Sequence, residues 1–116
     1  MSSKFLKIHI PYGSESAIGS GKADLLEAIQ RAGSISAAAR DMGMSYRRAW
    51  DLVDTMNRCF LQPLVETATG GSHGGGAQVT AFGLEVLGRY RELELKANAA
   101  VTAEVEALAI LLRPVA

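Results

Sequence analysis

The chain has 116 residues, and its 12 basic side chains balance 12 acidic ones, so its formal net charge is zero. A hydrophobic fraction of 48% supports one compact domain, and the length excludes two such domains or a deep catalytic cavity. The single Cys59 excludes an internal disulfide, and no apolar run reaches the roughly 18 residues of a membrane span. We therefore expect a cytoplasmic protein in which any anionic partner meets a local basic patch.

The N-terminal segment alternates between apolar and polar residues. Leu6, Ile8 and Ile10 fall on one face, with polar side chains between them. This period of two predicts a half-buried strand over residues 4–10 that ends at Pro11.

Apolar residues in the next three segments recur at steps of three and four, as they do on one face of a helix. Gly33 and Gly43 stand just past the first two segments, where a left-handed C-cap is expected. Ser34 and Ser45 are natural N-caps for the second and third segments. The predicted helices cover residues 20–32, residues 35–42, and the residues from 46 as far as Pro63.

The sequence changes character after the third predicted helix. LVETAT and AQVT are β-prone and flank GGSHGGG, so residues 64–80 are predicted to form a hairpin with a long glycine-rich tip. Thr80 then caps a last helix that runs to about Arg113. Roughly nine turns exceed what so small a domain can cover, so the outer half of this helix needs a partner. The predicted dimerisation residues are Val86, Tyr90, Leu93, Val101, Val105, Leu108 and Leu112.

Three short helices followed by a β-hairpin predict a mainly α fold with a small hairpin, a winged helix-turn-helix with a long C-terminal dimerisation helix. We divide it into a DNA-binding part, residues 1–80, and the dimerisation helix, residues 81–116. Arginine on the leading turn of the third helix suits guanine, and serines at helix starts suit phosphates. Trp50 is expected at the core or the domain edge. The predicted DNA-binding residues are Ser36, Ser45, Tyr46, Arg47, Arg48, His73, Gly74 and Gly75.

Residues 33–83 combine GSIS and an alanine run, SYRRAW, the pair Met56 and Asn57, and VETATGG…GGGA followed by Thr80 and Gly83. This combination resembles the N-terminal DNA-binding domain of the ModE family of molybdenum-responsive transcriptional regulators. The resemblance implies a homodimer that binds a palindromic operator in double-stranded DNA, for example near molybdate-transport or molybdoenzyme genes. Family members continue into β-rich molybdate-binding domains, whereas this sequence ends at Ala116, so no molybdate site is expected in this chain.

Other functions have weaker support from the sequence. His9, His73 and Cys59 do not fall at metal-ligand spacings, and Glu92 and Glu94 read as solvated helix residues that form no catalytic pair. We therefore expect no enzyme, no metal and no cofactor. The glycine-rich tip is either a DNA-contacting wing or a plain connector. The alternative function is a winged-helix adaptor that pairs through its last helix without binding DNA.

Overall fold

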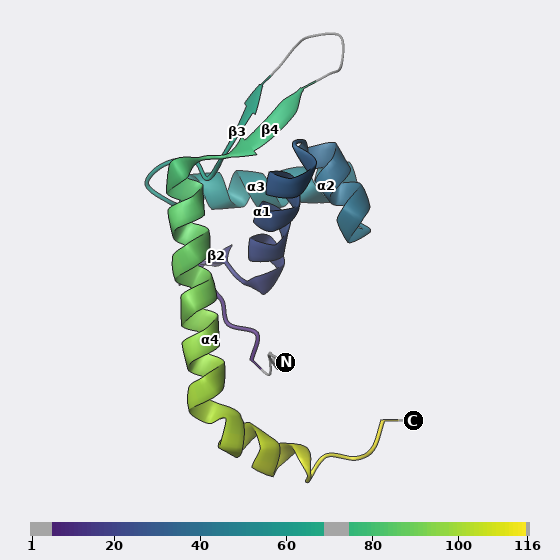
Figure 1. Cartoon of the computed structure of the whole chain (residues 1–116), viewed down its shortest axis with the longest axis vertical. Helices are drawn as coiled ribbons and strands as arrows, with labels where there is room; N and C mark the ends of the chain where they lie inside the picture. The colour runs from purple at the N-terminus through teal and green to yellow at the C-terminus, as the bar shows by residue number, and fades with distance from the viewer. Residues whose placement is uncertain (1–5, 69–74, 116) are drawn as a thin grey trace.

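The computed structural model describes residues 6–68 and 75–115. A body of three short helices carries an antiparallel hairpin at two of its edges, and a much longer helix runs down past it (Figure 1). The helices are α1 (Ser20–Ala32), α2 (Ile35–Met42), α3 (Tyr46–Cys59) and α4 (Ala81–Ala109). The hairpins are β1 (Ile10–Tyr12) with β2 (Glu15–Ile18), and β3 (Val65–Ala68) with β4 (Gly76–Val79).

The N-terminal hairpin corrects the predicted strand over residues 4–10. Residues 6–9 are irregular, and the first strand begins only at Ile10 and includes Pro11. Proline has no backbone N–H to donate to a neighbouring strand. An edge strand tolerates it because one side of the strand needs no hydrogen-bond donors. Gly13, with φ of +59°, makes the turn into β2, which was not predicted.

Local sequence signals place the other boundaries. Ser34 Oγ accepts a hydrogen bond from Ala37 N at 3.1 Å, and Ser45 Oγ accepts one from Arg48 N at 3.0 Å, so both predicted N-caps are confirmed. Gly33 closes α1 in the left-handed region, as predicted.

The third helix is shorter than predicted. It ends at Cys59, and Phe60 adopts an extended backbone instead of continuing towards Pro63. The Phe60 ring packs edge-on against Phe82 of α4, with ring centroids 6.5 Å apart. The apolar pattern therefore continues past the helix because a loop residue also faces the core.

The core lies between α1 and the two helices that follow it. Leu25, Leu26 and Ile29 of α1 are fully buried, and so are Ala38 of α2 and Ala49 of α3. The small alanine side chains allow the helices to approach closely. The face of α3 opposite Ala49 is left to the solvent.

Hydrogen bonds tie the β3–β4 hairpin, which we call the wing, to the body. The Asn57 side chain accepts from Leu64 N at 2.8 Å and donates to Val65 O at 3.1 Å. On the other strand, Ala77 N donates to Gly33 O at 2.9 Å. The wing is therefore fixed to the ends of both α1 and α3.

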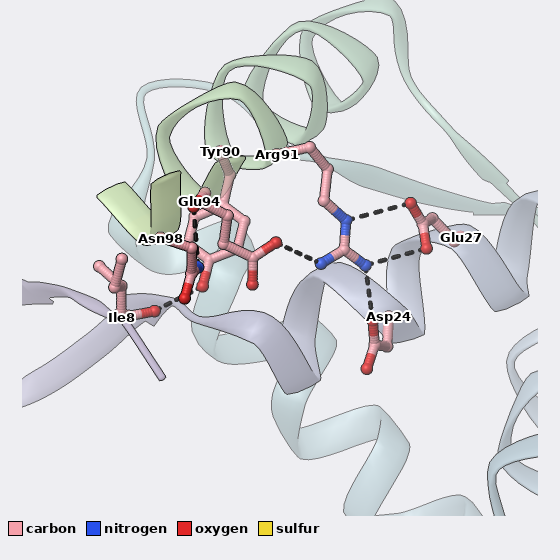
Figure 2. Close-up of polar contacts among 7 residues, drawn as sticks. All are labelled: Ile8, Asp24, Glu27, Tyr90, Arg91, Glu94 and Asn98. Carbon is pink, nitrogen blue, oxygen red and sulfur yellow. Dashed lines mark hydrogen bonds and ion pairs between the residues drawn. The ribbon is translucent and has the colours of Figure 1, made fainter. Parts of the chain in front are cut away.

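Arg91 of α4 joins the long helix to α1 through carboxylates, a cluster that we call the Arg91 clasp (Figure 2). Its guanidinium pairs with Glu94 and Glu27, each at 2.9 Å, and with Asp24 at 2.5 Å. The Glu94 side chain is only 3% exposed, so the expectation that it is solvated is wrong. The clasp fixes the angle at which α4 leaves the body.

The N-terminal segment runs beside α4 and is bonded to it (Figures 1 and 2). Leu6 N donates to Asn98 Oδ1 at 2.9 Å, and the Tyr90 hydroxyl donates to Ile8 O. Tyr90 is only 4% exposed. Its predicted place on an open dimerisation face is corrected, because this part of the helix packs on the chain itself.

Beyond Asn98 the same face of α4 continues without cover from the described part of the chain. Val101 and Val105 are half-buried, and Leu108 is exposed. The helix ends at Ala109, before its predicted end near Arg113, so Leu112 lies exposed in the turn that follows it. The radius of gyration is 16.5 Å, against roughly 13 Å for a compact domain of this length, and the difference reflects the projecting helix. The last turns of α4 bend away from its first part (Figure 1).

Candidate nucleic-acid interface

The leading turn of α3 is the most exposed part of the helical body that carries polar and aromatic side chains together. Ala49, Val53 and Met56 turn one face of α3 into the core. The Arg47 side chain is 87% exposed on the other face, and Tyr46 is 53% exposed. The burial pattern of α3 thus presents its first turn to the solvent, as a recognition helix requires.

Arg47 and Arg48 point in different directions. Successive residues of an α-helix are rotated by about 100°, so the two adjacent arginines cannot share a face. Arg47 pairs with Asp51, Nε to Oδ1, at 3.3 Å on the outward face. Arg48 lies towards α1: the pKa of Lys22 is lowered chiefly by burial, and the nearby positive charge of Arg48 lowers it further.

Two shallow hollows border the exposed side of α3. The first, of about 400 Å³, lies between the start of α2, the start of α3 and the wing. The second, of about 420 Å³, opens on the Arg47 side. Residues lining the first include Ser34, Ser36, Tyr46, Trp50, Thr67 and Gly75; those lining the second are Tyr46, Arg47, Trp50, Asp51 and Asp54.

Trp50 lines both hollows and is 40% exposed, so it does not belong to the core. The sequence interpretation placed it at the core or the domain edge, and Asp51 was also left out of the predicted site. The spacing of residues on a helix could have shown that Trp50 belongs to this surface. Trp50 follows Tyr46 by four residues, so both lie on one side of the helix, away from the centre of the Ala49 and Met56 face.

Acidic residues balance part of the positive charge here. At the end of α3, Arg58 pairs with Asp54 and Glu15, both at 3.0 Å. Hydrogen bonding to the Arg58 guanidinium lowers the pKa of Glu15 below its ordinary value. Among the described residues, Arg48 has no carboxylate partner within 4 Å, so its charge remains available to an anion.

The remaining predicted site residues fall in three groups. Ser36 is exposed at the start of α2, with its hydroxyl 3.5 Å from that of Ser34, and Ser45 is exposed at the start of α3. Gly75 lines the first hollow. His73 and Gly74 lie outside the described residues. The structure therefore brings together the predicted residues from the starts of α2 and α3 and Gly75, which directly precedes β4 of the wing.

Within residues 6–68 and 75–115, no group of three or more histidine, cysteine, aspartate or glutamate side chains is arranged to hold a metal ion. None of the described helices is long and apolar enough to cross a membrane.

No family model matches the chain. Individual proteins do match it: the molybdenum transport protein ModE of Azotobacter vinelandii is 44% identical over 85 residues, 73% of this chain and 32% of that protein. The molybdenum-pterin-binding protein MopA of Rhodobacter capsulatus is 49% identical over 77 residues, 66% of this chain and 29% of its own length. The DNA-binding transcriptional dual regulator ModE of Escherichia coli is 47% identical over 66 residues, 57% and 25% respectively.

A solved structure, ArgP from Mycobacterium tuberculosis, aligns with a TM-score of 0.50 at 18% identity and covers 72% of this chain and 29% of that one. This likeness concerns the fold alone. The packing of α1, α2 and α3 with the wing confirms the predicted winged helix-turn-helix.

The chain spans about a third or less of the length of the curated relatives it matches. Their names are those of transport, binding and regulatory proteins, in keeping with the expectation that the chain is not an enzyme. Over the matching segment, the chain is a homologue of the ModE regulators.

Proposed function

We propose that this chain is a sequence-specific transcriptional regulator that binds a palindromic site in double-stranded DNA as a homodimer in the cytoplasm. Residues 1–80 contact the duplex, and residues 81–116 form the dimerisation helix. Molybdate-transport or molybdoenzyme genes are the proposed targets, because relatives of this segment carry molybdenum-related names.

One observation carries the DNA-binding proposal. The start of α3 is exposed beside both the start of α2 and the wing, so residues of three elements border one surface. Arg47 is placed for base edges in the major groove, and Ser36 for the phosphate backbone. Arg48, on the α1 flank, is placed for a second phosphate contact.

The dimer proposal starts from the uncovered end of α4 and the turn that follows it. Leu108, Leu111 and Leu112 are each at least 66% exposed, and burial stabilises each large apolar side chain by about 1.5 to 3 kcal/mol. An apolar hollow of about 180 Å³ beside the first half of α4, lined in part by Phe60 and Leu93, adds to this surface. Twofold pairing through α4 would place two α3 helices on one side of a duplex.

Selection from a random duplex library tests the DNA-binding proposal. Wild-type protein is expected to enrich one palindromic sequence, and its affinity for that duplex is then measured by fluorescence anisotropy. Arg47→Ala is expected to cost about 1 to 3 kcal/mol on the selected site and to relax the preference at one base. Arg48→Ala is expected to weaken binding to all duplexes by a similar factor. It is also expected to reduce the slope of log affinity against log salt concentration by about one.

Lys96→Ala is the control, because Lys96 is 77% exposed on α4, where it pairs with Glu92, and it lines none of the hollows described above. It is expected to leave affinity for the selected duplex unchanged. The absence of any enriched sequence would contradict the DNA-binding function and favour the adaptor.

Light scattering tests the dimer separately. Val105→Glu with Leu108→Glu places charge on the uncovered face of α4 and is expected to yield monomers at micromolar concentration. Ala99→Glu with Ala103→Glu adds the same charge to the opposite face and is expected to leave the dimer intact. A wild-type monomer would contradict the paired-site proposal.

A further inference from the structure

Two aromatic side chains of α3 lie outside the core. Trp50 is 40% exposed although folding usually buries most of a tryptophan, and Tyr46 is 53% exposed. Because they are four residues apart, they lie on the same side of α3 and about 6 Å apart along its axis. Adjacent large apolar groups on a surface mark a contact with another molecule.

The surroundings of this pair are polar on both sides. Tyr46 and Trp50 separate the hollow next to the wing, which includes Ser36, from the hollow that includes Arg47 and Asp51. They form an apolar strip between side chains that form hydrogen bonds. A matching partner therefore presents an apolar group with donors and acceptors next to it.

We propose that Tyr46 and Trp50 recognise thymine by contacting its 5-methyl group in the major groove, a proposal that rests on the DNA-binding function above. The major groove presents donors and acceptors at every base pair, and the thymine methyl is its apolar group. The face of an aromatic ring buries a methyl group well but offers no partner to base donors and acceptors.

The geometry of α3 supports the major groove as the place of contact. A groove about 12 Å wide admits a helix, whereas the minor groove, about 6 Å wide, does not. The separation of the two positions along the helix axis is also close to the rise of two base pairs, about 6.8 Å. The pair therefore favours sites in which two thymines lie about two base steps apart.

The first test alters the DNA and uses wild-type protein. In the duplex that wild-type protein selects, each thymine is replaced in turn by uracil, which removes only the 5-methyl group and leaves Watson–Crick pairing intact. At a contacted position the affinity is expected to fall on the order of fourfold, the equivalent of one buried methyl group. Uracil at the other positions is expected to have no effect.

Protein variants then assign the contact. Trp50→Ala and Tyr46→Ala are each expected to abolish the thymine-over-uracil preference at one position. Tyr12→Ala is the control, because Tyr12 is a comparably exposed aromatic residue in β1. It is expected to keep the wild-type preference. Thermal unfolding checks that each variant is folded, and the uracil scan on wild-type protein needs no variant.

Each outcome separates the two proposals. If wild-type protein enriches no sequence, both the proposed function and this inference fail. If a sequence is enriched but uracil has no effect at any position, DNA binding stands and thymine recognition is overturned. The inference is also overturned if Trp50→Ala weakens the thymine and uracil duplexes equally, since that result indicates a backbone or stacking contact.

Discussion

Replacement of Gly83 by alanine tests the close approach of α4 to the start of the wing. Gly83 lies in the first turn of α4 and is buried. A Cβ built there would overlap the Leu64 carbonyl oxygen and lie 2.9 Å from Val79 Cγ1. Both neighbours belong to the base of the wing, so this glycine lets α4 start directly against it.

The obstructing group has little freedom to move. Leu64 O accepts from Thr80 N at 2.9 Å, and Leu64 N donates to the Asn57 side chain at 2.8 Å. Overpacking of a fixed core position costs roughly 3 kcal/mol at the upper end of the usual range, while the gain in helix propensity from glycine to alanine is about 1 kcal/mol. Gly83→Ala is therefore expected to destabilise the fold by about 2 kcal/mol.

Gly88 provides the matched control five residues later in the same helix. A Cβ there meets nothing within 4 Å, so Gly88→Ala is expected to stabilise the fold by about 1 kcal/mol. The two variants then differ by about 3 kcal/mol, which corresponds to roughly 10 °C or more in Tm for a chain of this size. Thermal unfolding followed by circular dichroism at one fixed protein concentration measures both. Equal stabilisation by the two substitutions would refute the close approach of α4 to Leu64.

Two further predictions concern the first half of α4. Arg91→Met removes the guanidinium that pairs with the buried Glu94 carboxylate and is expected to cost on the order of 3 kcal/mol in urea unfolding, whereas Arg89→Met on the exposed face is expected to change stability by less than about 0.5 kcal/mol; equal effects would contradict the clasp. Burial, and then the charge of Glu94, raise the pKa of Tyr90 from 10.0 to about 12, so the unfolded chain releases this proton at lower pH than the folded chain. The stability that Tyr90 contributes is thus fully present below pH 10 and is lost as pH rises towards 12; Tyr90→Phe is expected to reduce this alkaline slope, and an unchanged slope would count against the assignment.

The starts of the helices, the ends of α1 and α2, and the position of the wing followed from the sequence because their causes are local. Ser34, Ser45 and Thr80 each accept a hydrogen bond from an amide three residues ahead. Gly33 and Gly43 adopt left-handed backbone angles one residue past a helix end. Such signals depend on a few neighbouring residues and are visible in any printed sequence. Three local predictions were wrong: the strand over residues 4–10 took an irregular apolar segment for a paired one, and α3 and α4 end at Cys59 and Ala109, before the predicted ends near Pro63 and Arg113.

Only the tertiary structure determines which residues of the chain pack against each helix face. Apolar residues recur at steps of three and four along all of α4, in one stripe. Tyr90 nevertheless packs on the N-terminal segment, while Leu108 has no cover within the described chain. The contacts that divide the stripe join residues far apart in sequence: 64 positions separate Arg91 from Glu27, and 92 separate Asn98 from Leu6. Periodicity indicates that a helix face is apolar, but only the three-dimensional path of the chain determines how much of that face its own residues reach.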